Sequence, residues 1–131
     1  MILYHGTSKL RLKQILEEDC LRTTTANMPR VCLSSKYEPA LYFANLSAWT
    51  DTSSPFVIRL KAEDLLDNMY ALTPYSDPFY GEGECDWEYE VSVCEDIYPL
   101  GEVIKDFKEV PWTEVRSKCP PPITLWACMV F

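Results

Sequence analysis

The residues best suited to chemistry near the start of the chain are its only histidine, His5, and the three that follow, Gly6, Thr7 and Ser8. They follow a short apolar run, residues 2–4, which is typical of a β-strand. An imidazole at a strand end can position a ligand, and a neighbouring glycine lets that ligand approach the backbone closely because it has no Cβ. The Thr7 hydroxyl could add a contact, whereas Ser8 could cap a following helix.

Two carboxylates form a second group of candidate residues. Polar and apolar residues alternate along Trp-Glu-Tyr-Glu-Val-Ser-Val, residues 87–93, and this alternation predicts a half-buried strand. Glu88, Glu90 and Ser92 then share one face, opposite an apolar face. A polar strand face can line a cleft or can simply be solvated, and the alternation alone does not choose between them.

The elements that would position these groups alternate between strands and helices. Helices are predicted over residues 9–18 and 36–49, and one or two helical turns are predicted over 63–68. Ser35 and Glu38 are predicted to form a capping box at the start of the second helix. Strands are predicted at residues 2–5, 30–35, 55–62, 87–93 and 123–131, with a loop over 70–84. Residues 102–110 fit either a strand or a short helix. This order predicts a single α+β domain over residues 1–131.

The composition narrows the class of protein. A net charge of −8 and a pI near 4.6 argue against a broad nucleic-acid-binding face. The six cysteines include no C-x-x-C pair, and one histidine cannot complete a zinc-finger pattern, so no metal is predicted and free thiols in a reducing cytoplasm are expected. The longest uncharged apolar run, residues 123–131, is too short to span a bilayer. We therefore expect a cytoplasmic monomer that does not bind membranes.

The order of these features resembles the ADP-ribosyltransferase superfamily, and most closely its histidine–tyrosine–glutamate branch, which includes the poly(ADP-ribose) polymerases and diphtheria-type toxins. The shared features are His-Gly-Thr, an amphipathic helix, Cys-Leu-Arg at 20–22, a strand ending in serine, an aromatic helix and a late strand with a glutamate; they extend over about residues 3–93. The resemblance implies a split antiparallel β-sandwich of the ADP-ribosyltransferase type, with two helices packed on it near the N-terminal half.

The resemblance also implies NAD as a substrate and a role for each matching residue. His5 would hydrogen-bond the ribose next to the nicotinamide, the Gly6 backbone would hold the carboxamide, and Tyr42 would stack beneath the nicotinamide ring. A late-strand glutamate would hold the ribose 2′-hydroxyl and stabilise the positive charge that builds on the sugar as the C–N bond breaks. We expect this residue to be Glu90, with Glu88 on the acceptor side, although the alternation leaves either possible.

Thr7, Arg22 and Ser34 complete the predicted contacts to NAD. Arg22 follows the first helix and could meet a phosphate, and Ser34 is similar to the serine strand of the arginine-modifying branch. The chain departs from the histidine–tyrosine–glutamate pattern at Cys32, which stands where that branch carries its strand tyrosine. A thiol cannot stack on a ring, so Tyr42 or Tyr37 would have to supply the aromatic surface.

Three classes of function follow from these features. The first is an NAD-dependent mono-ADP-ribosyltransferase that cleaves the nicotinamide–ribose bond and modifies a small molecule or, as we expect, a protein; a toxin or phage effector would fit this size. The second is an enzyme similar to the RNA 2′-phosphotransferases, against which the five scattered arginines and the acidic net charge count. The third is a non-enzymatic binding or inhibitory module on the same fold, which Cys32 favours.

Overall fold

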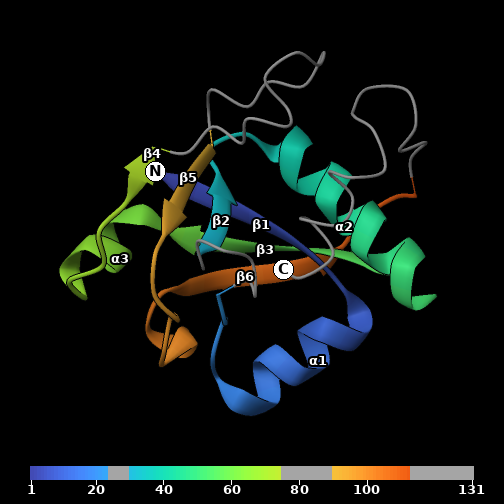
Figure 1. Ribbon diagram of the computed structural model, residues 1–131, viewed down its shortest axis with the longest axis horizontal. Coiled ribbons are helices and arrows are strands. Elements are labelled where there is room, and N and C mark those ends of the chain that lie inside the picture. The colour runs from blue at the N-terminus through green and yellow to red at the C-terminus, as the bar shows by residue number, and fades with distance from the viewer. Residues whose placement is uncertain (24–29, 75–89, 113–131) are drawn as a thin grey trace.

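The computed structural model describes residues 1–23, 30–74 and 90–112 (Figure 1). Along the chain the elements are β1 (Ile2–Ser8), α1 (Lys9–Glu18), β2 (Val31–Ser34), α2 (Tyr37–Asp51), β3 (Pro55–Lys61), α3 (Ala62–Asp67), β4 (Thr73–Pro74), β5 (Glu90–Val93), a 3₁₀ turn η2 (Leu100–Glu102) and β6 (Ile104–Glu109). The predicted α+β class is confirmed. The predicted loop beyond residue 74 and the predicted strand at 123–131 lie outside the described residues.

The strands form one sheet in the order β4-β5-β2-β1-β3-β6, and every neighbouring pair is antiparallel. Strand β1 pairs with β3 along its whole length, from Ile2 opposite Lys61 to Ser8 opposite Pro55. Its pairing with β2, by contrast, is registered at one position among the described residues, Tyr4 opposite Ser34. The sheet is therefore continuous but weakly joined between β1 and β2.

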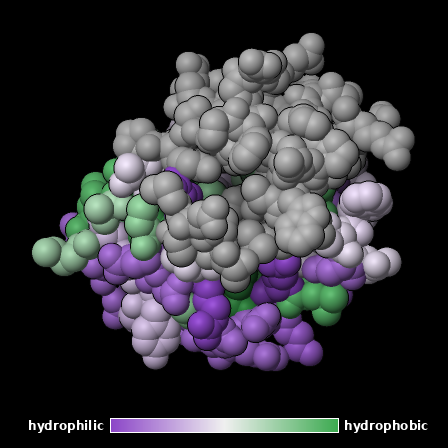
Figure 2. Space-filling model, viewed as in Figure 1, coloured by the Kyte–Doolittle hydropathy of each residue, from purple (hydrophilic) through white to green (hydrophobic). Residues whose placement is uncertain are grey.

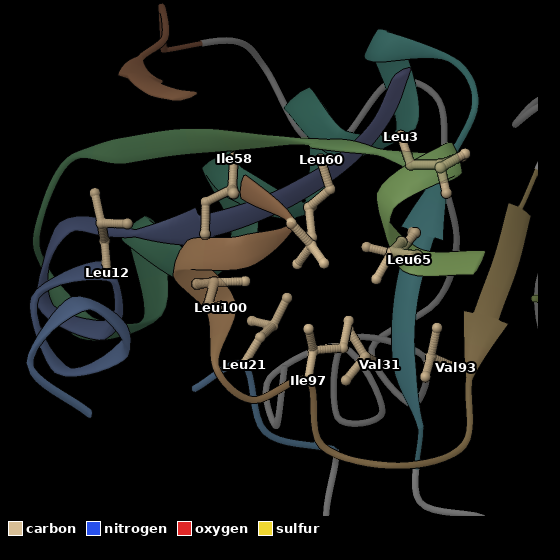
Figure 3. Close-up of a cluster of buried hydrophobic side chains, with 13 residues drawn as sticks. Leu3, Leu12, Leu21, Val31, Ile58, Leu60, Leu65, Val93, Ile97 and Leu100 are labelled. Atoms are coloured by element: carbon tan, nitrogen blue, oxygen red, sulfur yellow. The ribbon is translucent and has the colours of Figure 1, made fainter. Parts of the chain in front are cut away.

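The two faces of this sheet are covered by different helices. On one face, α1, α3 and the segment before η2 enclose a large apolar core, part of which is shown in Figure 3. The core contains Leu3, Leu12, Leu21, Val31, Leu33, Ile58, Leu60, Ala62, Leu65, Val93, Ile97, Leu100 and Val103. On the other face, α2 packs its alanines Ala40 and Ala44 against β1 and Val57 of β3. Strand alternation explains the division, because neighbouring residues of β1 face opposite sides.

The first helix has the boundaries that the periodicity predicts. The Ser8 hydroxyl accepts a hydrogen bond from the Arg11 backbone N–H at 3.2 Å and so caps α1, and the chain leaves the helix through Asp19 in the left-handed region, at φ 52°. Ser8 also donates to the Asp51 carboxylate at the end of α2. The charged residues of α1 lie in the lower, mostly hydrophilic half of the surface in Figure 2.

The predicted capping box at the second helix is wrong. Helix α2 begins one residue later than the box requires, because its N-cap is Lys36, whose side chain makes no capping hydrogen bond. The Lys36 backbone N–H donates instead to the Ser34 hydroxyl at 3.1 Å. Ser35 and Glu38 therefore do not stand in the positions that reciprocal capping needs.

The segment that fitted either a strand or a helix is the edge strand β6. It pairs with β3 from Phe56 opposite Glu109 to Arg59 opposite Asp106, after which the register shifts. Of the cysteines in the described ranges, Cys20 and Cys32 are buried free thiols and Cys94 is an exposed one. No helix within those ranges has the length and apolar character needed to cross a membrane.

Candidate functional site

His5 lies in the middle of β1 with 3% of its surface exposed. Its Nδ1 atom is 2.8 Å from the backbone carbonyl oxygen of Cys32 in β2. Because a carbonyl oxygen can only accept, Nδ1 carries the proton and donates it. Burial lowers the pKa of His5 below its ordinary value, and the charge of Arg11 lowers it further, against the opposing effect of the Cys32 carbonyl. The imidazole is therefore neutral at pH 7.

The other ring nitrogen of His5 is a buried acceptor. In a neutral ring protonated at Nδ1, Nε2 presents a lone pair, and Nε2 has no hydrogen-bond partner among the described residues. Leaving such a group unpaired costs free energy, so most buried polar atoms are paired. A ligand hydroxyl donated to Nε2 would remove that cost. The His5 ring is thus suited to accept a hydrogen bond, and not to act as an acid.

The backbone of Gly6 is directed toward β2. Two hydrogen bonds flank the β1–β3 ladder: the Ala62 N–H donates to the Met1 carbonyl at 2.9 Å, and the Lys9 N–H donates to the Ser54 carbonyl at 2.8 Å. In an antiparallel ladder alternate residues bond to a given neighbour, so the odd-numbered residues of β1 bond to β3. The N–H and C=O of Gly6 consequently point away from β3, toward β2.

Strands β1 and β2 separate where Gly6 would meet its partner. Continuing the register from Tyr4 and Ser34 would place Gly6 opposite Cys32, but no such pair is registered between these two described strands. The carbonyl of Cys32 accepts a hydrogen bond from Nδ1 of the His5 ring. The imidazole therefore contacts the backbone of the strand that Gly6 faces.

A small cavity lies at this separation. Its lining residues in the described part of the chain are Tyr4, His5, Gly6, Cys32, Leu33, Ser34, Ala40 and Phe43. Its volume is about 10 Å³, which is room for about one water molecule. The cavity is therefore closed to a ring the size of nicotinamide unless α2 or β2 shifts.

Gly6 has a packing role that its sequence context does not show. A Cβ at this position would lie 2.0 Å from the Ala40 carbonyl oxygen and 2.6 Å from the Ala44 nitrogen, both in the backbone of α2. The absence of a side chain thus lets α2 lie directly on β1. The bare Cα of Gly6 faces the helix, and only its N–H and C=O are directed at the strand gap.

Three of the predicted site residues come together around this cavity: His5, Gly6 and Ser34 all line it. Ser34 is 4% exposed, and its hydroxyl accepts from the Lys36 N–H. Thr7 is fully buried in β1 but does not line the cavity, and its hydroxyl has no hydrogen-bond partner within the described ranges. The predicted contact from Thr7 is therefore not supported.

The aromatic residue of α2 that lines this cavity, among the described residues, is Phe43, and the stacking role expected for Tyr42 stays a prediction. The residues of α2 that meet β1 include Ala40, Phe43 and Ala44, at the three- and four-residue spacing of one helix face. Tyr42 follows Ala40 by two residues, which places it about 200° around the helix. Its ring instead packs edge-on against Phe43, with centroids 5.3 Å apart.

Arg22 does not line this cavity, and its expected contact with a phosphate stays a prediction. Its side chain is exposed just beyond α1, and its Nε donates to the Glu18 carboxylate at 2.8 Å. The hydrogen bond from Arg22 lowers the pKa of Glu18. The guanidinium therefore pairs with its own helix and does not line the His5 cavity.

The backbone brings Glu90 close to the cavity in register. Glu90 is the first residue of β5 and pairs with Ser34, which in turn pairs with Tyr4, the residue before His5. The backbones of His5 and Glu90 thus belong to neighbouring rows of one sheet, although the two residues are far apart in sequence. Glu88 lies outside the described residues, so its predicted role stays a prediction.

No family model, curated protein or solved structure matches this chain. Within residues 1–23, 30–74 and 90–112 no group of three or more histidine, cysteine or carboxylate side chains could hold a metal ion. The chemistry of the site therefore depends on the strand gap, the neutral imidazole and the register of Glu90.

Because His5 is buried, the free energy of unfolding is expected to decrease at acidic pH. Above the ordinary pKa of 6.5 the ring is neutral whether or not the chain is folded. Below 6.5 the unfolded chain binds a proton before the folded one does, so the free energy of unfolding decreases as pH falls toward the lowered folded-state pKa. One proton limits this slope to about 1.4 kcal/mol per pH unit.

We expect His5→Asn to remove this dependence, because the asparagine amide can still donate to the Cys32 carbonyl but does not titrate. Urea unfolding at about pH 7.5 and about pH 5.5 would measure it in both proteins. The loss of stability between the two pH values should be smaller in the variant. An equal loss in both proteins would show that the folded ring is protonated as easily as a solvated one.

Proposed function

We propose that this protein cleaves the nicotinamide–ribose bond of NAD and transfers the ADP-ribose to an acceptor, which we expect to be a protein. The observation that carries the proposal is the buried Nε2 of a neutral His5, which has no hydrogen-bond partner among the described residues and lies next to the strand separation at Gly6. An acceptor nitrogen held in this way is complementary to a ribose hydroxyl. We further propose that the sheet belongs to the ADP-ribosyltransferase fold, in which such a strand separation is expected.

Gly6 supports the binding of a carboxamide. A primary carboxamide has an N–H donor and a C=O acceptor side by side, and so does the edge of a β-strand. The N–H and C=O of Gly6 are directed toward β2 at the place where the registered pairing of the two described strands ends. A nicotinamide in this gap would complete the ladder that the two strands leave unfinished.

Glu90 would supply the electrostatic part of the mechanism. As the bond between nicotinamide and ribose breaks, positive charge develops on the sugar, and a fixed carboxylate lowers the energy of that state. The register with Ser34 supports this role for Glu90, because it sets the strand that carries Glu90 beside the strand that lines the cavity. His5 would position the ribose as a neutral acceptor, so proton transfer by the ring is not required.

The size of the cavity requires a movement before NAD binds. About 10 Å³ admits roughly one water molecule, so β1 and β2 must separate further or α2 must shift from Gly6. This same observation favours a second candidate, a non-enzymatic module on the same fold whose closed gap never admits NAD. Cys32, which stands where the histidine–tyrosine–glutamate branch has a tyrosine, also favours the non-enzymatic module. The two candidates differ in whether nicotinamide is released.

The test is incubation of the full chain with NAD that carries one isotope in the nicotinamide and another in the adenosine. A transferase releases free nicotinamide, and in the presence of cell lysate it leaves the adenosine label on a macromolecule. Release of nicotinamide without transfer would indicate that water is the preferred acceptor. No release above a buffer control would reject the proposal and leave the non-enzymatic module.

A further inference from the structure

A second and larger cavity lies on the α2 face of the sheet. In the described part of the chain it is lined by Tyr4, Tyr37, Val57, Arg59 and Lys108, and its volume is about 270 Å³. Small-molecule sites in proteins commonly have volumes of roughly 300–1,000 Å³, so this cavity is near the lower end of that range. It shares Tyr4 with the small cavity at His5 but includes neither His5 nor Gly6.

The strand register places charged side chains on the sheet side of this cavity. Tyr4 of β1 pairs with Arg59 of β3, which pairs with Asp106 of β6. In the next row of the same face, Val57 pairs with Lys108. Directly opposed residues of antiparallel strands point to the same side, so both cations lie on the side where Tyr37 of α2 also lines the cavity.

The cavity carries a local positive charge in an acidic protein. Asp106 accepts hydrogen bonds from both Nε and a terminal nitrogen of Arg59, the first at 2.6 Å, and this guanidinium lowers the pKa of Asp106. Asp106 is therefore ionised at pH 7 and offsets the charge of Arg59. Lys108 forms no salt bridge with another described residue, so its charge is left in excess.

Two tyrosine rings form the wall of the cavity. Tyr4 and Tyr37 are in edge-to-face contact, with ring centroids 5.9 Å apart and an interplanar angle of 77°. Neither phenol hydroxyl makes a hydrogen bond to another residue in the ranges that the structure describes. The rings can therefore pack against a planar group while their hydroxyls remain available to bind oxygen atoms.

From this arrangement we propose that the cavity binds a nucleoside monophosphate. The base packs against Tyr4 and Tyr37, and the phosphate binds the Lys108 ammonium and the N–H groups of Arg59 that do not bind Asp106. An ammonium bound to a phosphate forms one of the stronger hydrogen bonds in proteins, because both groups are charged. The tyrosine hydroxyls bind phosphate or sugar oxygens. This site does not depend on the proposed reaction with NAD, since it uses neither His5 nor Glu90.

Calorimetric titration of the full chain with AMP tests the proposal, with adenosine and inorganic phosphate as partial ligands. AMP should bind more tightly than either part alone. Lys108→Ala should weaken AMP binding by about tenfold or more, as expected for the loss of one charged contact. Tyr37→Leu should weaken the binding of both AMP and adenosine, because it removes part of the surface for the base.

Lys105→Ala is the matched control for Lys108→Ala. Lys105 is an exposed lysine on the same strand but does not line the cavity, and it stands where the β3–β6 register shifts. Its replacement should change AMP binding by less than about twofold, within the effect of one distant surface charge. A His5→Ala variant should also keep AMP binding, which separates this site from the proposed reaction.

The proposal is overturned if AMP does not bind, or if it binds no better than inorganic phosphate. It is equally overturned if Lys105→Ala weakens AMP binding as much as Lys108→Ala, because AMP affinity would then depend on the total charge of β6 and not on a contact with Lys108. Failure of the NAD reaction together with normal AMP binding would reject the proposed function alone.

Discussion

We expect Glu90→Gln to lower the proposed release of nicotinamide from NAD by about 100- to 1,000-fold, the usual effect of removing one electrostatic contact to the charge of a transition state. Glutamine has nearly the shape of glutamate but lacks its negative charge, so it cannot stabilise the developing positive sugar. The backbone pairing of Glu90 with Ser34 does not involve the side chain and should be preserved. Circular dichroism and the unfolding midpoint should therefore match the wild type while the rate falls.

Glu95→Gln is a suitable control for this experiment, since Glu95 is an exposed carboxylate just beyond β5. It should leave the release rate unchanged. If Glu90→Gln retains the wild-type rate, the assignment to Glu90 is wrong, and Glu88→Gln then decides between the two carboxylates. If neither variant slows release, no carboxylate of residues 87–93 takes part in the reaction.

Gly6→Ala destabilises the protein by about 3 kcal/mol or more, at or beyond the upper end of the usual cost of overpacking. The added Cβ would lie 2.0 Å from the Ala40 carbonyl oxygen and 2.6 Å from the Ala44 nitrogen, and both are backbone atoms of α2. The helix can relieve these contacts only by moving away from β1. Urea unfolding at pH 7 measures the effect, and loss of a cooperative transition would be its extreme form.

Gly101→Ala gives the comparison for Gly6→Ala. The nearest atom to a Cβ at Gly101 would be a side-chain oxygen of Asp19, 3.4 Å away, and that carboxylate can move. The stability of this variant should change by less than about 1 kcal/mol, as for a substitution without strain. If both glycine variants are equally stable, α2 does not lie against β1 as closely as described.

The sequence predicts the elements of the N-terminal half well, because local signals there agree with tertiary packing. The apolar spacing of residues 9–18 and the hydroxyl of Ser8 define α1 at both ends. The second helix is predicted less well, since a capping box is a short pattern and the helix begins one residue later, after Lys36 in an extended conformation. β6 could not be distinguished from a helix, because its strand state depends on pairing with β3.

The candidate site is predicted in part. Pattern and resemblance together single out His5, Gly6 and Ser34, and the fold places all three at one cavity. Periodicity gives the spacing of a helix face but not which face turns toward the sheet, so it could not indicate that Phe43 lines the cavity. The His5–Cys32 hydrogen bond could not be predicted, because it depends on how β1 and β2 are registered.

The sequence alone could not bring together the residues that line the larger cavity. Tyr4, Arg59 and Lys108 are separated by about fifty residues or more at each step and belong to three strands. Each taken alone is typical of an ordinary strand residue. Alternation along β3 could have indicated that Val57 and Arg59 share a face. Only the strand order β1-β3-β6 brings the three side chains to one place.

The central claim is that Nε2 of His5 is an acceptor that NAD reaches between β1 and β2, and nitrogen-15 NMR of the imidazole tests it most directly. The chain has one histidine, so the two ring nitrogens give a single assignable pair of signals. Without NAD, we predict a protonated Nδ1 and an unprotonated Nε2. With NAD in excess, the Nε2 signal should move as it accepts a ribose hydroxyl, while Nδ1 stays bonded to Cys32. Signals that do not move, or a ring protonated at Nε2 from the start, would contradict the account.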